Sequence, residues 1–573
     1  MLAALARAVI YGIDYMKSDA AVIHDDRLHL SLYPYREVPE QRSLSQEPNL
    51  DRVSQSRFGF GISRRKILVA LLIVLAFLVP LWPGFEESAP AMDEGSLLVY
   101  PELILKGELP YRDFETFYGP ANLWVLSAVY AGFGPSIFVE RGVGLICRVL
   151  VLLIIFALVQ RWGTTLAAGC VLLSGVVLLP LGLTAYAWIG GIICVLASLW
   201  LVANPESRAR CFWGGILAGW ALLFRLDLGP AVIISGLPLF FLMPPTQRWH
   251  YLGGAVLGLL PLAWLTVAAG PHEIINNLVI YPVIYSSPGR HLPILSVRNN
   301  LLWFFLVHLT AVAGNIFAGF IAVRANGRDS TARLLLGLAL LGLGITHQAA
   351  QRLDLVHTVS TAFVSLGVLP LSILVIQSHF RITGRRQVDA LIATAIALVL
   401  LEVAVPQLAV NARKQIITSF TGKNTKMVFM AQSGRSFPMS SSQTALELGK
   451  IFDRLEALAK PGERLFVGPA DLRRTNYNDT FIYHMMPQLR PATYFLEMNP
   501  QSANRPGSRL GKDIASADWL VLNREFDRWH EPNQSAKFAS DEPMQVVRDQ
   551  FELCGQYGTR DLYRRRIRPV PKF

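Results

Sequence analysis

The chain has 573 residues, of which 52% are hydrophobic and only 16% are charged. Soluble globular proteins carry about 25% charged residues, and apolar runs of membrane-spanning length recur between residues 68 and 406, so the composition excludes a typical soluble enzyme and predicts a polytopic membrane protein. The chain has 53 Lys and Arg residues and 41 Asp and Glu residues, which gives a formal net charge of +12. We assign this excess to cytoplasmic loops and anionic lipid rather than to nucleic acid, because no basic-aromatic cluster is present.

The amino-terminal segment, residues 1–66, is predicted to be a polar cytoplasmic tail. It ends in the basic cluster Arg64-Arg65-Lys66, directly before the apolar run 67–83. By the positive-inside rule this cluster stays in the cytoplasm and the first span runs outward. We therefore expect residues 84–141 to form a long external first loop.

The predicted transmembrane domain, residues 67–406, holds eleven apolar runs. Eleven crossings place Arg161 and the basic connections 204–210, 244–251, 324–333 and 379–387 in the cytoplasm, and the last span then leaves residues 407–573 outside as a soluble domain. The predicted spans are residues 67–83, 142–160, 164–182, 184–203, 211–224, 229–243, 252–269, 299–323, 333–349, 360–378 and 388–406.

Residues 119–134 are apolar enough to suggest a further span. A crossing here would turn every later basic connection to the outside, and the stretch is short and bounded by Gly-Pro at both ends. We expect instead a helix on the membrane surface, with Trp124 and Tyr130 at headgroup depth.

The carboxy-terminal segment, residues 407–573, mixes strand and helix signals. Residues 464–468 and 519–522 are short β-rich apolar runs, whereas 443–459 has helical periodicity. This alternation predicts a small α/β domain. The segment contains a single cysteine, Cys554, so a disulfide within it is excluded. The expected fold class is an α-helical polytopic membrane protein with a C-terminal extracytoplasmic α/β domain.

Two of the predicted external turns carry charged or titratable residues. The first turn has Arg225 and Asp227, and the second has Arg352, Asp354 and His357. Ionisable groups at membrane depth are costly unless they are paired or face a polar cavity, so these residues are candidates for substrate binding. The spacing of Asp354 and His357 also favours a pair on one helical face. The structural alternatives are a mutual ion pair at a helix end for Arg225 and Asp227, and anchoring of helix ends in water for the other turn.

We expect structural roles for two other groups of residues, one in the external loop after residue 270 and one in the first loop. Tyr281, Tyr285, Arg290 and His291 lie in the external loop 271–298. We expect them to belong to the interfacial belt rather than to a substrate groove. Arg112 is expected to stabilise the first loop through its neighbour Asp113.

The strongest local signal is the pair Asp93-Glu94, about ten residues beyond the first span. Two adjacent carboxylates in a membrane-facing loop can act as a general base and its helper, because like-charge coupling and partial burial raise one pKa toward the working range. The alternative is that both residues only charge the first turn of the next helix.

These residues belong to a longer pattern. An Asp-Glu pair after the first span, a Tyr, a Gly-x-x-Pro-Tyr-x-Asp stretch and a Tyr-Gly-Pro turn into an apolar helix resemble the GT-C glycosyltransferases, above all the protein O-mannosyltransferase and aminoarabinose transferase branch. The resemblance covers roughly residues 90–145 in detail, and the span pattern extends it to about residue 406. The matching residues are Asp93, Glu94, Tyr100, Gly107, Pro110, Tyr111, Asp113, Tyr118, Gly119 and Pro120.

The resemblance implies a GT-C-like catalytic domain that moves a sugar, with inversion, from a polyprenyl-phosphate donor to an external glycan, lipid or protein. Asp93 would take the proton from the acceptor hydroxyl, and Glu94 would bind substrate or tune Asp93. A phosphate leaving group needs positive charge where negative charge develops, for which Arg352 and Arg225 are the candidates. The other expected substrate-binding residues are His357, Asp354, Asp227, Asp113, Tyr118 and Tyr100.

The resemblance also implies a multi-pass protein of the plasma (inner) membrane. A divalent metal stays open, because some branches use an Asp-x-Asp motif whereas this chain has Asp-Glu, and the sequence identifies no third oxygen ligand. Two rival functions stay open as well. A transporter or flippase for a lipid-linked sugar would also need a charged cavity, but matched broken helices in two halves are not visible. A polymerase or ligase of lipid-linked glycans would use the same arginine-phosphate contacts without needing the Asp-Glu pair.

Overall fold

The computed structural model describes residues 64–292, 299–380, 384–421, 427–475, 477–525 and 535–566. The chain divides into two compact units, Met1–Ile62 and Ser63–Phe573, and all of the described residues belong to the second. The predicted cytoplasmic tail lies outside the described residues up to residue 63.

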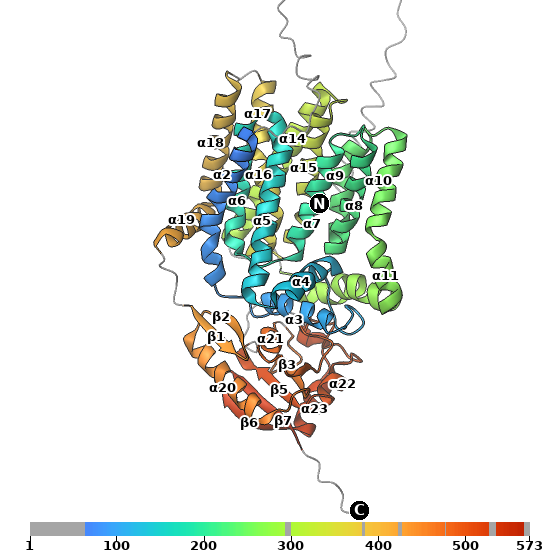
Figure 1. The fold of residues 1–573 in the computed structure, drawn as a ribbon, viewed down its shortest axis with the longest axis vertical. Helices are drawn as coiled ribbons and strands as arrows, with labels where there is room; N and C mark the ends of the chain where they lie inside the picture. Colours follow the sequence, from blue (N-terminus) through green and yellow to red (C-terminus); the bar gives the residue numbers. More distant parts are fainter. Residues whose placement is uncertain are drawn as a thin grey trace, which may run out of the picture. The chain divides into compact units, whose positions relative to one another are not determined.

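A bundle of apolar helices forms the larger part of this unit (Figure 1). Every predicted span coincides with one helix or with two consecutive helices. In the described ranges, seven helices are long and apolar enough to cross a membrane, and shorter apolar helices cover residues 72–86, 187–202 and 226–240. The bundle helices are α2 (Arg64–Leu81), α5 (Ile137–Val159), α6 (Thr164–Leu178), α7 (Ala187–Val202), α8 (Arg208–Phe224), α9 (Gly229–Phe240), α10 (Pro245–Gly258), α11 (Leu260–Ala269), α14 (Asn299–Ala325), α15 (Ser330–Gln351), α16 (Leu355–Gly367), α17 (Leu369–His379) and α18 (Arg386–Ala404).

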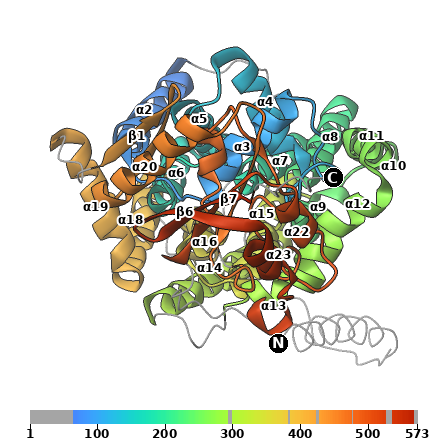
Figure 2. The same cartoon turned by 90° about the horizontal axis from the view of Figure 1, so that it is seen from below.

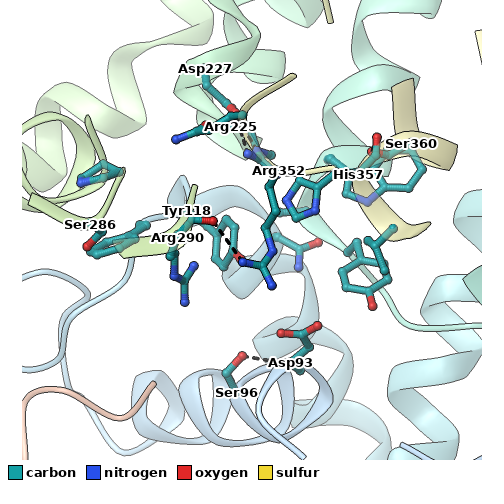
Figure 3. A pocket seen from close by; sticks show the side chains of 18 of the residues that line it. Asp93, Ser96, Tyr118, Arg225, Asp227, Ser286, Arg290, Arg352, His357 and Ser360 are labelled. Atoms are coloured by element: carbon teal, nitrogen blue, oxygen red, sulfur yellow. Dashed lines mark hydrogen bonds and ion pairs between the residues drawn. The ribbon is translucent and has the colours of Figure 1, made fainter. Parts of the chain in front are cut away.

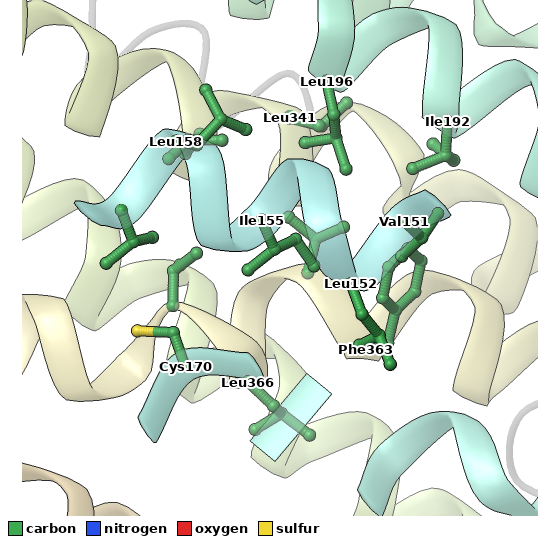
Figure 4. Close-up of a cluster of buried hydrophobic side chains, with 14 of the residues drawn as sticks. Val151, Leu152, Ile155, Leu158, Cys170, Ile192, Leu196, Leu341, Phe363 and Leu366 are labelled. Atoms are coloured by element: carbon green, nitrogen blue, oxygen red, sulfur yellow. The ribbon is translucent and has the colours of Figure 1, made fainter. Parts of the chain in front are cut away.

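Branched aliphatic side chains fill the interior of the bundle. Val151, Leu152 and Ile155 of α5 belong to one hydrophobic cluster with Phe363 and Leu366 of α16 (Figure 4), and all five are at most 3% exposed. Helices α8 and α10 approach closely because glycines replace larger side chains between them. A Cβ added at Gly254 of α10 would lie 2.1 Å from the carbonyl oxygen of Phe212.

The first loop forms two helices, α3 (Asp93–Leu105) and α4 (Pro120–Phe133), after a short turn η2 (Trp82–Glu86). Both lie across one end of the bundle rather than within it (Figure 1), and the placement of residues 119–134 on a membrane surface stays a prediction. Tyr130 is buried and donates through its hydroxyl to the carbonyl of Leu97, which contradicts its expected place at headgroup depth. Gly119 allows the chain to enter α4 against the bundle, because a Cβ there would lie 1.9 Å from the carbonyl oxygen of Leu223.

The loop after α11 is also helical. It consists of α12 (Pro271–Ile275), the π-helix η6 (Asn276–Tyr285) and α13 (Ser286–Arg290). A π-helix is rare and often marks a functional segment.

The carboxy-terminal part begins with a helix that was expected in the soluble domain, α19 (Pro406–Thr421). Leu408 and Ala412 of α19 are buried against the bundle, and Gln415 donates to the carbonyl of Leu179. Helix α19 therefore packs on the bundle, and the strands and helices of the soluble domain follow it.

The soluble domain is a mixed α/β structure, as predicted. Its five-stranded sheet has the order β4-β3-β5-β7-β6, with β3 parallel to β4 and β5 and with β7 antiparallel to β5 and β6. The predicted strands at 464–468 and 519–522 are β3 and β5, and the predicted helix at 443–459 is α20. The elements are β1 (Val428–Gln432), β2 (Arg435–Met439), α20 (Ser442–Leu458), β3 (Arg464–Pro469), α21 (Phe481–Met485), β4 (Arg490–Pro491), α22 (Leu510–Ala515), β5 (Trp519–Asn523), η9 (Ser535–Phe538), α23 (Glu542–Gln550), β6 (Phe551–Tyr557) and β7 (Arg560–Arg565).

This domain packs on the first loop. Figure 2 looks onto the domain, with the bundle helices behind it. The backbone N–H of Glu115 donates to the carbonyl of Tyr494 at 2.8 Å, and Ser286 of α13 donates to the carbonyl of Pro500 at 2.9 Å. Leu98 and Leu103 of α3 share one hydrophobic cluster with residues of the sheet.

Candidate active site

A cavity of about 440 Å³ lies where the first loop, the bundle and the soluble domain meet. Its walls come from α3, the segment before α4, the turns after α8 and α15, the helical loop around α13, and residues of the soluble domain (Figure 3). Asp93, Arg225, Arg352 and His357 all line it. The expected meeting of an acid, guanidinium groups and an imidazole in one place is therefore observed.

Asp93 is the first residue of α3, where a carboxylate is favoured by the helix dipole. Its side chain points from the helix toward Arg352 and His357 (Figure 3). Burial raises the pKa of Asp93 above its ordinary value, and the positive charges of Arg290 and His357 oppose that increase. Asp93 is thus a carboxyl group whose proton affinity is raised and which faces the cavity directly.

The turn after α15 carries a compact charge network. Asp354 caps α16, and its Oδ1 accepts hydrogen bonds from the backbone N–H and, at 2.8 Å, from Nδ1 of His357. Nε of Arg352 donates to the other oxygen at 2.8 Å. Burial favours a higher pKa for Asp354, but His357 and Arg352 outweigh it and hold that pKa at about 2. The predicted pairing of Asp354 with His357 is confirmed.

The turn after α8 holds the second expected pair. Arg225 donates through Nε to Oδ1 of Asp227 at 2.9 Å and through Nη2 to Oδ2. The guanidinium also lies over the ring of Tyr118, 5.6 Å from its centroid. The helix-end ion pair, which was the structural alternative, is observed and lines the cavity, whereas a part in substrate binding stays a prediction.

Two tyrosines of the first-loop motif also line the cavity, as expected. Tyr100 stacks on Phe114 with the ring centroids 4.9 Å apart, and its buried hydroxyl has no hydrogen-bond partner among the described residues. Tyr118 is held by Tyr111, whose hydroxyl donates to the Tyr118 carbonyl at 2.8 Å. Tyr111 itself has a φ of 71°, a strained value for a bulky residue that its complete burial maintains.

Glu94 does not line the cavity, and this corrects the expectation of a catalytic role. Although adjacent to Asp93, it points along a different face of α3 into the protein. Its two oxygens accept from Nε and Nη2 of Arg141 at 3.0 and 2.7 Å, and Oε1 also accepts from Thr184. Both side chains of the pair are at most 2% exposed. Glu94 therefore fixes α3 to α5.

Asp113 is likewise a structural residue, contrary to the expected part in substrate binding. It is paired with Arg112 at 2.7 Å and accepts from the backbone N–H of Leu109 at 2.8 Å. It closes the turn between α3 and the Tyr-Gly-Pro segment and does not line the cavity. The structural role expected for Arg112 is observed.

Arg290 lines the cavity, although the sequence around it did not predict a place in the candidate site. The interfacial role given to it is wrong, because it lines the cavity on the side of α13, close enough to Asp93 to influence its pKa. Within the described ranges its guanidinium has no ion-pair partner, in contrast to Arg225 and Arg352. Tyr281 and Tyr285 instead lie under Arg505 of the soluble domain, at 5.3 and 4.5 Å from its guanidinium carbon.

The soluble domain also contributes to the cavity, and no sequence pattern indicated where. Nη2 of Arg352 donates to the hydroxyl of Tyr477 at 2.8 Å, across 125 residues of sequence. Tyr477 and Pro500 line the cavity. In the described part of the chain, no group of three or more His, Cys, Asp or Glu residues is placed to hold a metal ion, so no metal ligand can be assigned.

Comparison with known proteins gives similarity to solved structures alone. No protein-family model and no curated protein matches the chain. Two crystal structures of ArnT from Cupriavidus metallidurans are similar to it. The one bound to undecaprenyl phosphate is 14% identical, with a TM-score of 0.48 over 86% of this chain and 97% of that one. The apo structure is 13% identical, with a TM-score of 0.47 over 87% of this chain and 98% of that one. The activity of this chain is therefore inferred from its own residues.

The Glu94–Arg141 pair yields a prediction about stability. Glu94→Gln leaves the buried guanidinium of Arg141 without its counter-charge, which costs on the order of 3 kcal/mol. We expect a clearly lower midpoint of thermal unfolding for the purified protein in detergent. Asp541→Asn makes the same chemical change in the exposed pair with Arg548, where both side chains are more than half exposed, and should leave the midpoint nearly unchanged. Equal midpoints for Glu94→Gln and the wild type would contradict the assigned structural role.

Proposed function

We propose that the chain is an inverting membrane glycosyltransferase that moves a sugar from a polyprenyl-phosphate donor to the hydroxyl of an extracytoplasmic acceptor. The observation that carries this proposal is the cavity, in which the carboxylate of Asp93 faces Arg352, Arg290 and His357. A base and several cations around one space are what displacement of a phosphate by a hydroxyl requires. The first-loop motif, which resembles the GT-C enzymes, supports the same reaction.

Asp93 acts as the general base in this proposal. Its carboxylate takes the proton of the acceptor hydroxyl while the hydroxyl oxygen forms a bond to the anomeric carbon. The bond from that carbon to the phosphate oxygen breaks at the same time, and the polyprenyl phosphate leaves with the electron pair. The raised pKa of Asp93 suits this role, because a stronger base accepts the proton more readily.

The cations stabilise the departing phosphate. Arg225 and Arg352 are each neutralised in part by an aspartate, Asp227 or Asp354, so they orient the phosphate more than they add net charge. Arg290 has no such partner among the described residues and is the cation best placed to bind the phosphate dianion. The ordered turns keep these groups in position before the reaction begins, which lowers the reorganisation cost.

The acceptor reaches the cavity from the side of the soluble domain in this proposal. We infer that it is a cell-envelope glycan, a lipid or a protein, since each offers a hydroxyl outside the membrane. A transporter or a polymerase of lipid-linked glycans stays the rival function. It would share the arginines but would not depend on the basicity of Asp93.

We predict that Asp93→Asn abolishes transfer. The amide keeps the size and most contacts of the carboxylate but cannot accept the proton, and loss of a general base costs at least about 100-fold in rate. The measurement offers radiolabelled polyprenyl-phosphate sugars and a cell-envelope extract to the purified protein. Full transfer by Asp93→Asn would remove Asp93 as the base. If neither protein transfers sugar but the wild type moves the labelled lipid across vesicles, the rival transporter is supported.

We predict that Arg290→Gln shifts the pH dependence of transfer. Asp93 must be ionised to act as a base, so activity falls as the pH drops through its raised pKa. The positive charge of Arg290 opposes that increase, and its removal therefore moves the acidic limb of the kcat/KM profile to higher pH. Arg290→Lys retains the charge and should leave the limb where it is. A limb that stays in place or moves to lower pH in Arg290→Gln would show that this charge does not act on Asp93.

The proposal also implies an orientation in the plasma membrane. The cavity and the soluble domain lie outside, because the basic connections of the predicted spans face the cytoplasm. A reporter enzyme that is active only outside the cytoplasm, fused to the C-terminus of the full chain, should be active, and a fluorescent reporter that folds only in the cytoplasm should stay dark. The opposite pattern would place the cavity on the wrong side for an external acceptor.

A further inference from the structure

Helix α3 has three faces, and each face contacts a different part of the protein. Successive residues of an α-helix are rotated by about 100°, so Asp93, Ser96 and Tyr100 share one face, and all three line the cavity. Glu94 lies on a second face and binds Arg141 of α5. Gly95 and Glu102 lie on a third face, on the side opposite Asp93. Residues 94 to 103 are all buried, so protein encloses the helix up to its last two residues.

The soluble domain holds this third face through a buried charged cluster. Arg435 of β2 donates through Nη2 to Oε2 of Glu102 at 2.8 Å and through Nη1 to Oε1. His484 of α21 lies with Nδ1 2.7 Å from Oε1 of the same glutamate and is itself completely buried. Burial raises the pKa of Glu102, but His484 and Arg435 outweigh it and keep the pKa below its ordinary value. Glu102 is therefore a charged anchor inside the protein.

A second contact lies at the end of α3 that carries Asp93. The backbone N–H of Phe481 in α21 donates to the carbonyl of Ala91, two residues before Asp93, at 3.2 Å. Gly95 packs directly on this segment, and a Cβ added there would lie 2.4 Å from the backbone nitrogen of Phe481. Phe481 also stacks on Phe437 of β2 with the ring centroids 4.3 Å apart. The domain thus contacts α3 at both ends.

We propose that Glu102, Arg435 and His484 are positioning residues for Asp93, so that the soluble domain is required for the transfer step itself in addition to any part in acceptor binding. This inference rests on the proposed function, in which Asp93 is the base. None of the three residues lines the cavity. Together with the Glu94–Arg141 pair at the other end of the helix, they set where α3 lies relative to Arg352 and His357, which belong to the bundle.

The geometry gives this coupling a physical basis. Glu102 is nine residues from Asp93, about 13 Å along α3. A shift of the anchored end is therefore transmitted to the carboxylate instead of being absorbed by a flexible loop. A displacement of about 1 Å at the reacting groups is enough to lower a rate by about 100-fold. Binding of the donor phosphate depends on other elements and should be affected little.

The test measures kcat, donor KM and donor binding for full-length Glu102→Gln and Arg435→Met in the sugar-transfer assay. We expect kcat, calculated per protein molecule that binds donor, to fall by about tenfold or more. The donor KM should stay within about twofold of the wild-type value. Arg435→Lys keeps the charge and should recover part of the loss. Arg548→Met changes the exposed pair with Asp541 in the same domain and should match the wild type.

The outcomes separate positioning from simple stabilisation. If the residues only stabilise the fold, fewer molecules bind donor but each of them keeps the wild-type kcat, which would overturn the inference. If Arg435→Met cannot be purified in folded form, His484→Gln removes one partner and Gly95→Ala perturbs the same face without touching the cluster. Wild-type kcat in both would likewise overturn it. Absence of transfer by the wild type with every donor would instead refute the proposed function.

Discussion

The candidate site depends on the contacts of one buried side chain, the guanidinium of Arg141. It is 2% exposed and binds Glu94 of α3 through Nε and Nη2, while its Nη1 donates to the carbonyls of Gly84, Phe85 and Glu87 at 2.9–3.1 Å. One side chain of α5 thus joins the end of the first span to the helix that carries Asp93. A buried charge is costly unless every donor is satisfied, and here each nitrogen has a partner. The first loop is therefore joined to the bundle through a buried ion pair.

Most of the charged side chains that line the cavity are paired with a side chain of opposite charge. Arg225 is paired with Asp227, and Arg352 with Asp354, which leaves Asp93 and Arg290 as the two cavity groups without an ion-pair partner among the described residues. An unpaired carboxylate and an unpaired guanidinium in one space are each available to a substrate. The paired groups keep those two in place and limit the desolvation cost of the site.

The sequence predicted the features that depend on local pattern. Apolar runs and basic connections identified the helices, and the three-residue spacing of Asp354 and His357 identified their contact. Features that depend on long-range packing were missed. Glu94 and Asp93 are adjacent, yet the rotation of α3 sends one to Arg141 and the other to the cavity, and no sequence pattern indicated which. Arg290 resembled an interfacial residue, and the contact of Tyr477 with Arg352 spans 125 residues. Helix α19 packs on the bundle, although its sequence is polar enough to resemble a surface helix.

The distribution of cysteine has a consequence for how the protein can be labelled. All five cysteines are unpaired, and Cys554 is the one thiol beyond residue 211. With this one cysteine, the soluble domain holds no internal disulfide. The same arrangement makes Cys554, half-buried on β6, a natural single attachment point for a thiol-reactive spectroscopic probe on that domain.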